Sequence, residues 1–192
     1  VCRDLCDFSV YLLRSLGIPA VTDQYKVSPH TSGAHSWNAV RDTTGQIVSF
    51  WLPESKVGRG VDDGRPKGKV FRYEYGGEVR DVTSRYFGTN EAKIKVIPDF
   101  KGKELELCVF TCGNYIPVGK GQTKGGAALF RNLEPGIRFF PMYRNETGRL
   151  AFAGHPFSID SLGRTVSYVP DSTSGHRAVL RRKYAYHHHL KE

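Results

Sequence analysis

Hydrophobic residues recur at a helical period near the start of the chain. Leu5, Phe8, Leu12 and Leu16 form one apolar stripe, and this spacing is typical of a helix that buries one face. Gly17-Ile18-Pro19 follows the last of them and ends the pattern. The first sixteen residues are therefore predicted to form a buried helix of about four turns.

A strand and a hairpin are predicted next. Val21, Asp23, Tyr25 and Val27 alternate with polar residues, which is the pattern of a half-buried strand. Residues 34–41 and 46–52 are two further β-rich runs, separated by Asp42-Thr43-Thr44-Gly45 with glycine where a positive φ is wanted. If residues 42–45 form the whole loop, Val40 pairs with Ile47, Trp37 with Phe50, and His35 lies opposite Leu52.

The region from Pro53 to Gly77 is rich in Gly, Lys, Arg and Asp. We expect it to be mostly loop, with one short strand over residues 69–75.

The second half of the chain shows short β-type runs at regular spacing, each bounded by Gly, Pro, Asn or Asp. No helical period lies between them, so they predict an antiparallel sandwich or barrel. The eight runs are residues 92–97, 105–111, 115–118, 127–130, 137–143, 150–152, 157–159 and 165–169.

Charge divides the 192-residue chain unevenly. The net charge is +9, of which residues 1–84 carry +1 (11 basic, 10 acidic) and residues 85–192 carry +8 (17 basic, 9 acidic). We therefore predict two domains, 1–84 and 85–192. Such a surplus is more often a solvated surface than a polyanion site, so no nucleic-acid partner is expected. No run of about eighteen apolar residues exists to span a membrane.

The four cysteines form two close pairs, Cys2 with Cys6 and Cys108 with Cys112. A spacing of four does not suit a local disulfide on either a helix or a strand. The pattern also lacks the Cys-x-x-Cys and His spacing of a zinc site. We expect no metal and no cofactor.

Two residues suggest nucleophilic catalysis. Cys2 lies at the start of the predicted helix, where free backbone N–H groups and the helix dipole favour a thiolate. His35 begins a strand that alternation places on one face with Trp37. A cysteine at a helix start with a histidine on a packed strand is how several cysteine enzymes pair nucleophile and base.

Two blocks of sequence resemble a known superfamily. Cys2-Arg3-Asp4-Leu5-Cys6 followed by residues 12–20 (LLRSLGIPA), and then Gly33–Val40 (GAHSWNAV), are similar to motifs of the bacterial transglutaminase-like superfamily. The resemblance places Cys2 on the nucleophile, His35 on the general base and Cys6 on a small core residue. Residues 81–192 resemble, more loosely, a β-rich module that follows this domain in a group of uncharacterised exported bacterial proteins.

The resemblance implies an α+β fold class: a truncated, cysteine-proteinase-type transglutaminase-like domain, followed by an all-β antiparallel sandwich domain. It implies a cysteine-dependent hydrolase that cleaves a peptide or amide bond, located in the periplasm or at the cell surface. It also implies that an upstream segment, which closes the site in the superfamily, precedes Val1. Of the oxyanion donors, only the Cys2 backbone N–H can be named.

The third member of the catalytic set departs from the superfamily, which places an aspartate on the strand after the histidine. Leu52 is predicted to lie opposite His35, and leucine cannot orient an imidazole. Glu54 is the nearest carboxylate and is the predicted orienting residue, although Pro53 interrupts the strand. Asp23 and Asn38 are weaker substitutes.

The missing aspartate keeps a second function open. In that alternative the domain is catalytically inactive and belongs to a surface protein that binds a glycan, peptide or cell-wall polymer. Trp37, Trp51 and Phe50 would then line the binding groove, and in the catalytic reading Trp37 and Trp51 would contact the substrate.

Overall fold

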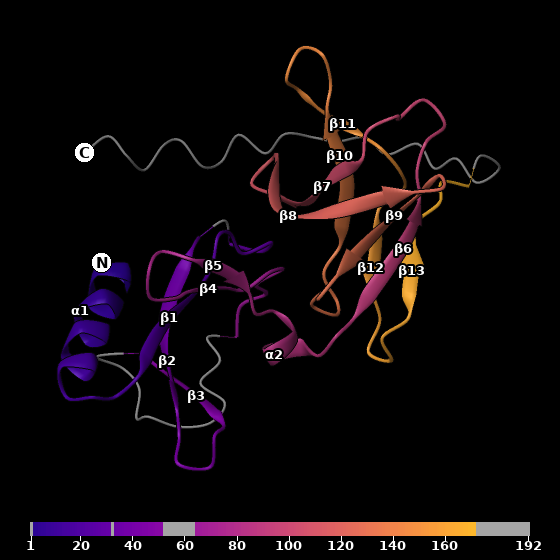
Figure 1. The fold of residues 1–192 in the computed structure, drawn as a ribbon. Coiled ribbons are helices and arrows are strands. Elements are labelled where there is room, and N and C mark those ends of the chain that lie inside the picture. Colours follow the sequence, from indigo (N-terminus) through magenta and orange to yellow (C-terminus); the bar gives the residue numbers. More distant parts are fainter. Residues whose placement is uncertain (1, 32, 52–63, 172–192) are drawn as a thin grey trace, which may run out of the picture.

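A computed structural model describes residues 2–31, 33–51 and 64–171 of the chain. They form two antiparallel sheets (Figure 1). The first sheet has the strand order β3-β2-β1-β4-β5, and the second has the order β13-β12-β10-β7-β8-β9-β6, with β11 paired to β10. The elements of the first part are α1 (Cys2–Ser15), β1 (Ala20–Tyr25), β2 (His35–Arg41), β3 (Ile47–Phe50), β4 (Phe71–Tyr73), β5 (Val79–Asp81) and α2 (Ser84–Phe87).

The second sheet contains the remaining strands. They are β6 (Glu91–Lys95), β7 (Glu104–Thr111), β8 (Asn114–Lys124), β9 (Ala127–Arg131), β10 (Phe139–Arg144), β11 (Leu150–Phe152), β12 (Phe157–Ile159) and β13 (Thr165–Ser167). The sheet curves so far that β13, at one edge, approaches β6, at the other. The predicted all-β, sandwich-like character of this part is confirmed.

The predicted fold class is wrong. The chain is mostly antiparallel β structure, and among the described residues the only α-helices are α1 and the single turn α2. A cysteine-proteinase-type domain needs a helical body facing its sheet, whereas here one helix lies on the outer face of a five-stranded antiparallel sheet (Figure 1). The α+β domain that the resemblance implied is therefore not the fold of this chain.

Helix α1 ends as its sequence predicts. Gly17 has a φ of 76°, and the backbone N–H groups of Gly17 and Ile18 donate to the carbonyl oxygens of Arg14 and Leu13. This Schellman arrangement needs the positive φ that glycine adopts without a steric penalty.

The buried face of α1 is not the one that the sequence predicts. The small residues Cys6 and Ser9 are buried against the first sheet, because they let the helix backbone approach the strands closely. The larger residues of the apolar stripe face solvent, with Phe8 63% and Leu16 68% exposed. The stripe from Leu5 to Leu16 is therefore an uncovered surface among the described residues.

The hairpin between β2 and β3 differs by one residue from the predicted register. Val40 pairs with Val48 and Asn38 with Phe50, not Val40 with Ile47. Asp42 and Gln46 are joined by a backbone hydrogen bond, so the turn has three residues and ends on Gly45 with a φ of 81°. A three-residue turn with a left-handed glycine shifts the pairing relative to a four-residue loop.

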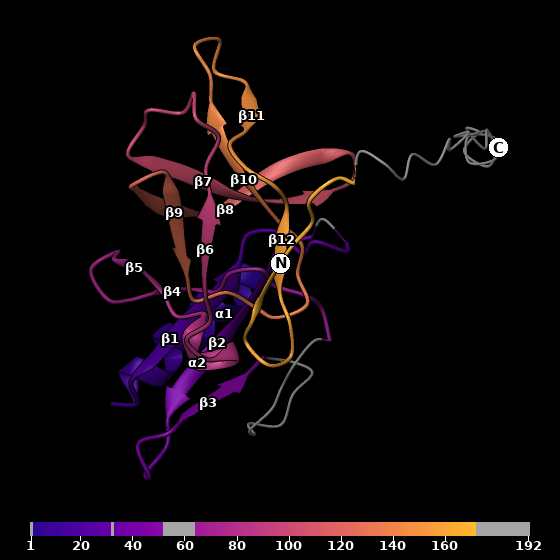
Figure 2. The ribbon, with the colours of Figure 1, turned by 90° about the vertical axis from the view of Figure 1, so that its right-hand side faces the viewer.

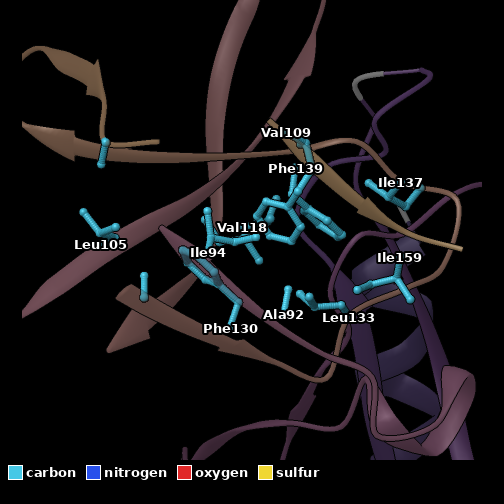
Figure 3. Packing of buried hydrophobic residues seen from close by; sticks show 14 of the residues in the cluster. Ala92, Ile94, Leu105, Val109, Val118, Phe130, Leu133, Ile137, Phe139 and Ile159 are labelled. Carbon is cyan, nitrogen blue, oxygen red and sulfur yellow. The ribbon is translucent and has the colours of Figure 1, made fainter. Parts of the chain in front are cut away.

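The core of the second sheet is a cluster of aliphatic and aromatic side chains that converge from its strands (Figure 3). Phe130, Phe139 and Phe157 are fully buried, and the Phe157 ring centroid lies 5.6 Å from that of Phe130 and 5.7 Å from that of Phe139. Val27, which follows β1 in the first sheet, also belongs to this cluster. The two sheets thus share part of one core.

The connection between the sheets is further fixed by polar contacts. The Glu134 carboxylate accepts hydrogen bonds from the backbone N–H groups of Lys67 (2.7 Å) and Gly68 (2.6 Å). The Lys69 ammonium group donates to Asp81 and to the carbonyl oxygen of Arg131, both at 2.5 Å. All these groups except Asp81 and Arg131 belong to buried residues, so the segment before β4 is held between the sheets.

Candidate active site

Cys2 is the first residue of α1 and is partly exposed. The next residue anchors this end of the helix, because the Arg3 guanidinium donates to the Gln24 side chain (3.2 Å) and lies over the Tyr73 ring (4.2 Å). Gln24 pairs with Ser36, one residue after His35. Cys2 and His35 therefore lie at the same end of the first sheet.

The other cysteines have different surroundings. Burial, together with the neighbouring Cys2 and Asp7, raises the pKa of the Cys6 thiol to about 12, and its backbone carbonyl accepts a hydrogen bond from Asn38 at 3.0 Å. Burial also raises the pKa of the Cys108 thiol to about 12. Both thiols are neutral packing groups at pH 7. Cys112 is exposed, and all four cysteines are free.

His35 is the first residue of β2 and pairs with Tyr25. Its ring lies among three aromatic rings, with centroid distances of 6.2 Å to Tyr25, 6.1 Å to Trp37 and 5.0 Å to Trp51. Because Asn38 faces α1, strand alternation places His35 on the face that the helix does not cover. No hydrogen bond joins the Cys2 thiol to His35 in the described structure.

Asp23 belongs to a buried hydrogen-bond network on the same sheet face as His35. Its carboxylate accepts two hydrogen bonds of 2.7 Å from the Arg72 guanidinium and one of 2.5 Å from the Tyr86 hydroxyl. The Tyr86 oxygen in turn accepts a hydrogen bond from the Trp37 indole at 2.9 Å. Burial and the Asp23 charge raise the pKa of Tyr86, which stays a neutral donor. Asp23 therefore neutralises Arg72 and does not orient His35.

The two predicted tryptophans have different roles in the fold. Trp37 is 5% exposed and packs in the core of the first sheet with Tyr25, Val70 and Val82. Phe50 is likewise buried. Trp51 is half-buried, and its ring meets the His35 ring edge to face. Of the three residues predicted to line a groove, Trp51 alone retains substantial exposure.

The predicted orienting residue, Glu54, lies outside the described residues, as does Leu52. The corrected register changes what faces the imidazole: extending the β2–β3 pairing sets Trp51 opposite Trp37, on the same face as His35. The Trp51 ring therefore shares a face with the His35 ring and contacts it.

Sequence reasoning missed the partners of Asp23. A carboxylate that alternates with Val21 and Tyr25 on one strand is a charge at a core position, and a buried charge needs a counter-charge. That signal predicts that a partner exists. It does not identify Arg72, 49 residues further along the chain.

Comparisons with family models, with curated proteins and with solved structures found no match to this chain. No described helix has the length and apolarity needed to cross a membrane. Within residues 2–31, 33–51 and 64–171, no group of three or more His, Cys, Asp or Glu side chains is arranged to hold a metal ion.

Proposed function

We propose that Cys2 and His35 form a thiol–imidazole pair that hydrolyses an amide or peptide bond. The observation that carries the proposal is the position of Cys2, a free and partly exposed thiol on the first residue of a 14-residue helix, at the sheet end where His35 lies. The first N–H groups of a helix have no partner within it and favour negative charge nearby. The likeness of both sequence blocks to transglutaminase-like motifs supports the same pairing.

The reaction follows from these two groups. In the proposed reaction the His35 imidazole, which strand alternation places on the sheet face opposite α1, reaches around the sheet end that it shares with Cys2 and takes the proton of the Cys2 thiol. The thiolate then attacks the amide carbonyl carbon. The tetrahedral intermediate collapses to a thioester when His35 returns the proton to the leaving amine. A water molecule, deprotonated by His35, then attacks the thioester and releases the acid and the free thiol. The backbone N–H of Cys2 is the proposed donor to the developing oxyanion.

The surroundings of His35 set the expected rate. In triad enzymes, losing the group that orients the imidazole costs about 10⁴ in kcat. Asp23 is held by Arg72 and Tyr86, so it does not supply that function. Stoichiometric acylation of Cys2 is the preferred assay, because it detects the first step of the reaction whether or not Glu54, which lies outside the described residues, orients the imidazole.

The test compares Cys2 with Cys112, the matched exposed cysteine. An activated thiol at pH 7 should react with iodoacetamide at least about tenfold faster than Cys112, and His35→Ala should remove the difference. With p-nitrophenyl acetate, peptide mass spectrometry should show an acetyl group on Cys2 that is later lost to water. Equal alkylation of the two thiols, unaffected by His35→Ala, would overturn the proposal.

A second candidate is a surface protein that binds a peptide, glycan or cell-wall polymer without turnover. The specific observation in its favour is that the partly exposed ring of Trp51 packs edge to face against His35. If this candidate is right, Cys2 and Cys112 react with iodoacetamide at equal rates. Trp51→Ala should weaken binding of the polymer, and Cys2→Ala should leave that binding unchanged. In both cases the likeness to exported proteins supports a periplasmic or cell-surface location.

A further inference from the structure

Four aromatic side chains gather on the outer face of the second sheet. Phe110, Tyr115, Phe140 and Phe152 are here called the aromatic platform. Phe110 is 46% and Phe152 47% exposed, and the rings of Phe110, Phe140 and Phe152 lie 5.0 to 5.2 Å from that of Tyr115.

The platform stands apart from the core of the sheet. Phe110 pairs with Tyr115, and Phe140 pairs with Cys108 on the same strand as Phe110. Alternation directs Val109 to the other face, where it joins the buried cluster. The platform therefore lies on the face opposite the buried cluster, and Phe110 and Phe152 leave nearly half of their surface exposed there.

A pocket of about 320 Å³ adjoins the platform. Phe110 and Phe140 form its apolar wall, and Arg138, Tyr168 and His30 supply polar groups. Its volume is near the lower end of the range for small-molecule sites, which suits a ligand unit of one or two rings.

The polar side of the pocket is held in place. The Tyr168 hydroxyl lies 3.0 Å from that of Ser158, and the Tyr168 backbone N–H donates to the carbonyl oxygen of Pro156 at 2.8 Å. The Arg138 guanidinium lies 4.5 Å from the centroid of the Tyr168 ring, an arrangement that orients its planar fork.

Arg138 is the charge that gives the pocket its selectivity. Elsewhere on this face Lys120 pairs with Glu104 and Arg144 with Glu106. Arg138 is exposed and forms no ion pair with any described residue, and the residues lining the pocket include no carboxylate. The pocket therefore presents a positive charge beside apolar rings and favours an anionic group attached to a ring.

The position of the platform discriminates between kinds of ligand. An extended peptide binds a sheet through the free backbone groups of an edge strand. Here β7 is hydrogen-bonded to β8 on one side and to β10 on the other, so this face offers ring faces and no free backbone. A saccharide ring needs only a ring face for its C–H groups and solvent or rim groups for its hydroxyls.

We propose that the aromatic platform and the adjoining pocket bind an acidic saccharide chain, with a uronate carboxylate on Arg138 and successive sugar rings on Phe110, Phe140 and Tyr115. This site is separate from Cys2 and His35 and does not depend on their chemistry.

The experiment titrates the full chain with oligogalacturonate of four to six units and with its methyl ester, by calorimetry. We expect the acid to bind at least about tenfold more tightly than the ester. Arg138→Gln should lose that difference, and Phe110→Ala and Tyr115→Ala should each weaken binding severalfold. Arg149→Gln is the matched control, since Arg149 is also exposed but lies in the hairpin between β10 and β11, which projects from the rest of the second sheet (Figure 2). Thermal melts establish that each variant is folded.

Three results would overturn the proposal. The first is equal affinity for the acid and its ester. The second is an equal loss of affinity for the acid in Arg138→Gln and Arg149→Gln. The third is comparable binding of poly-glutamate or of vesicles rich in phosphatidylglycerol. Either of the first two results would show that Arg138 does not bind the uronate carboxylate. The third makes the surface a general anion or membrane site. Cys2→Ala should bind oligogalacturonate like the unmodified chain, so this test is independent of the thiol chemistry.

Discussion

The ion pair of Asp23 with Arg72 is the most consequential contact at the scale of single residues. Both side chains are buried, 5% exposed for Arg72 and 0% for Asp23, and the pair is bidentate, with Tyr86 as a third partner. The free-energy cost of removing two charges from water is offset only when the pair has good geometry and further hydrogen bonds. Removing one partner leaves the other charge buried without a counter-charge.

Replacing Asp23 tests this account. Asp23→Asn should lower the free energy of unfolding by about 3–5 kcal/mol, because Arg72 would remain buried without a counter-charge. Tyr86→Phe is the control: it removes the hydroxyl's hydrogen bonds to Asp23 and Trp37, keeps the ion pair and should cost about 1–3 kcal/mol. Urea denaturation measures both. Equal losses in the two variants would show that the ion pair contributes no more than the hydroxyl.

The candidate site was predictable from sequence only in part, because some of its residues are positioned by their sequence neighbours and others by distant segments. Local pattern places Cys2 at a helix start and His35 on a strand, because both depend on neighbouring residues. Which side chains of the next strand share a face with His35 depends on strand register, and the register here changes with one residue of turn length at Gly45. The long-range partner of Asp23 has no local signal at all.

At the scale of elements, α1 shows what periodicity does and does not determine. The period predicted the helix, which begins and ends close to the expected residues. It also predicted which face is apolar, but not which face is buried. The first sheet packs against Cys6 and Ser9, since small side chains allow close approach, and leaves the larger residues outside. The strands of the second sheet were found from their turns, but their closure into a curved sheet depends on pairings between distant segments.

Matched leucine substitutions test the exposed face of α1. Leu16→Ala should change the free energy of unfolding by less than about 0.5 kcal/mol, because Leu16 is 68% exposed. Leu107→Ala, at a fully buried position of β7, should cost about 2–5 kcal/mol. Chemical denaturation of both variants gives the comparison. A cost above about 2 kcal/mol for Leu16→Ala would mean that the apolar stripe is covered in solution.

At the scale of the whole molecule, the two sheets are joined by specific contacts and not by a simple linker. Glu134, which follows β9 in the second part, accepts two buried N–H groups from the segment that precedes β4. Both tryptophans lie in or next to the first sheet, so their fluorescence reports on that sheet alone. Far-UV circular dichroism reports on the strands of both.

Removing the Glu134 carboxylate should weaken this connection. Glu134→Ala should lower the free energy of unfolding by about 2–4 kcal/mol, because the N–H groups of Lys67 and Gly68 lose their acceptor in a buried place. Tryptophan fluorescence and circular dichroism should then give separate urea transitions, where the unmodified chain gives one.

Glu104→Ala is the matched control, because Glu104 forms an exposed ion pair with Lys120 and the loss of an exposed pair should leave the free energy of unfolding nearly unchanged. Coincident transitions in Glu134→Ala would contradict the role given to Glu134.

The position of Val27 limits how the second sheet can be transferred to another protein. Its side chain leaves the neighbourhood of β1 and fills space among the aliphatic residues of the second sheet. A graft that transferred residues 85–171 to a new host would arrive with a hole at that place and with Glu134 facing water instead of amides. The segment that can be transferred intact is therefore larger than either sheet, and it includes the connections that pass from one sheet to the other.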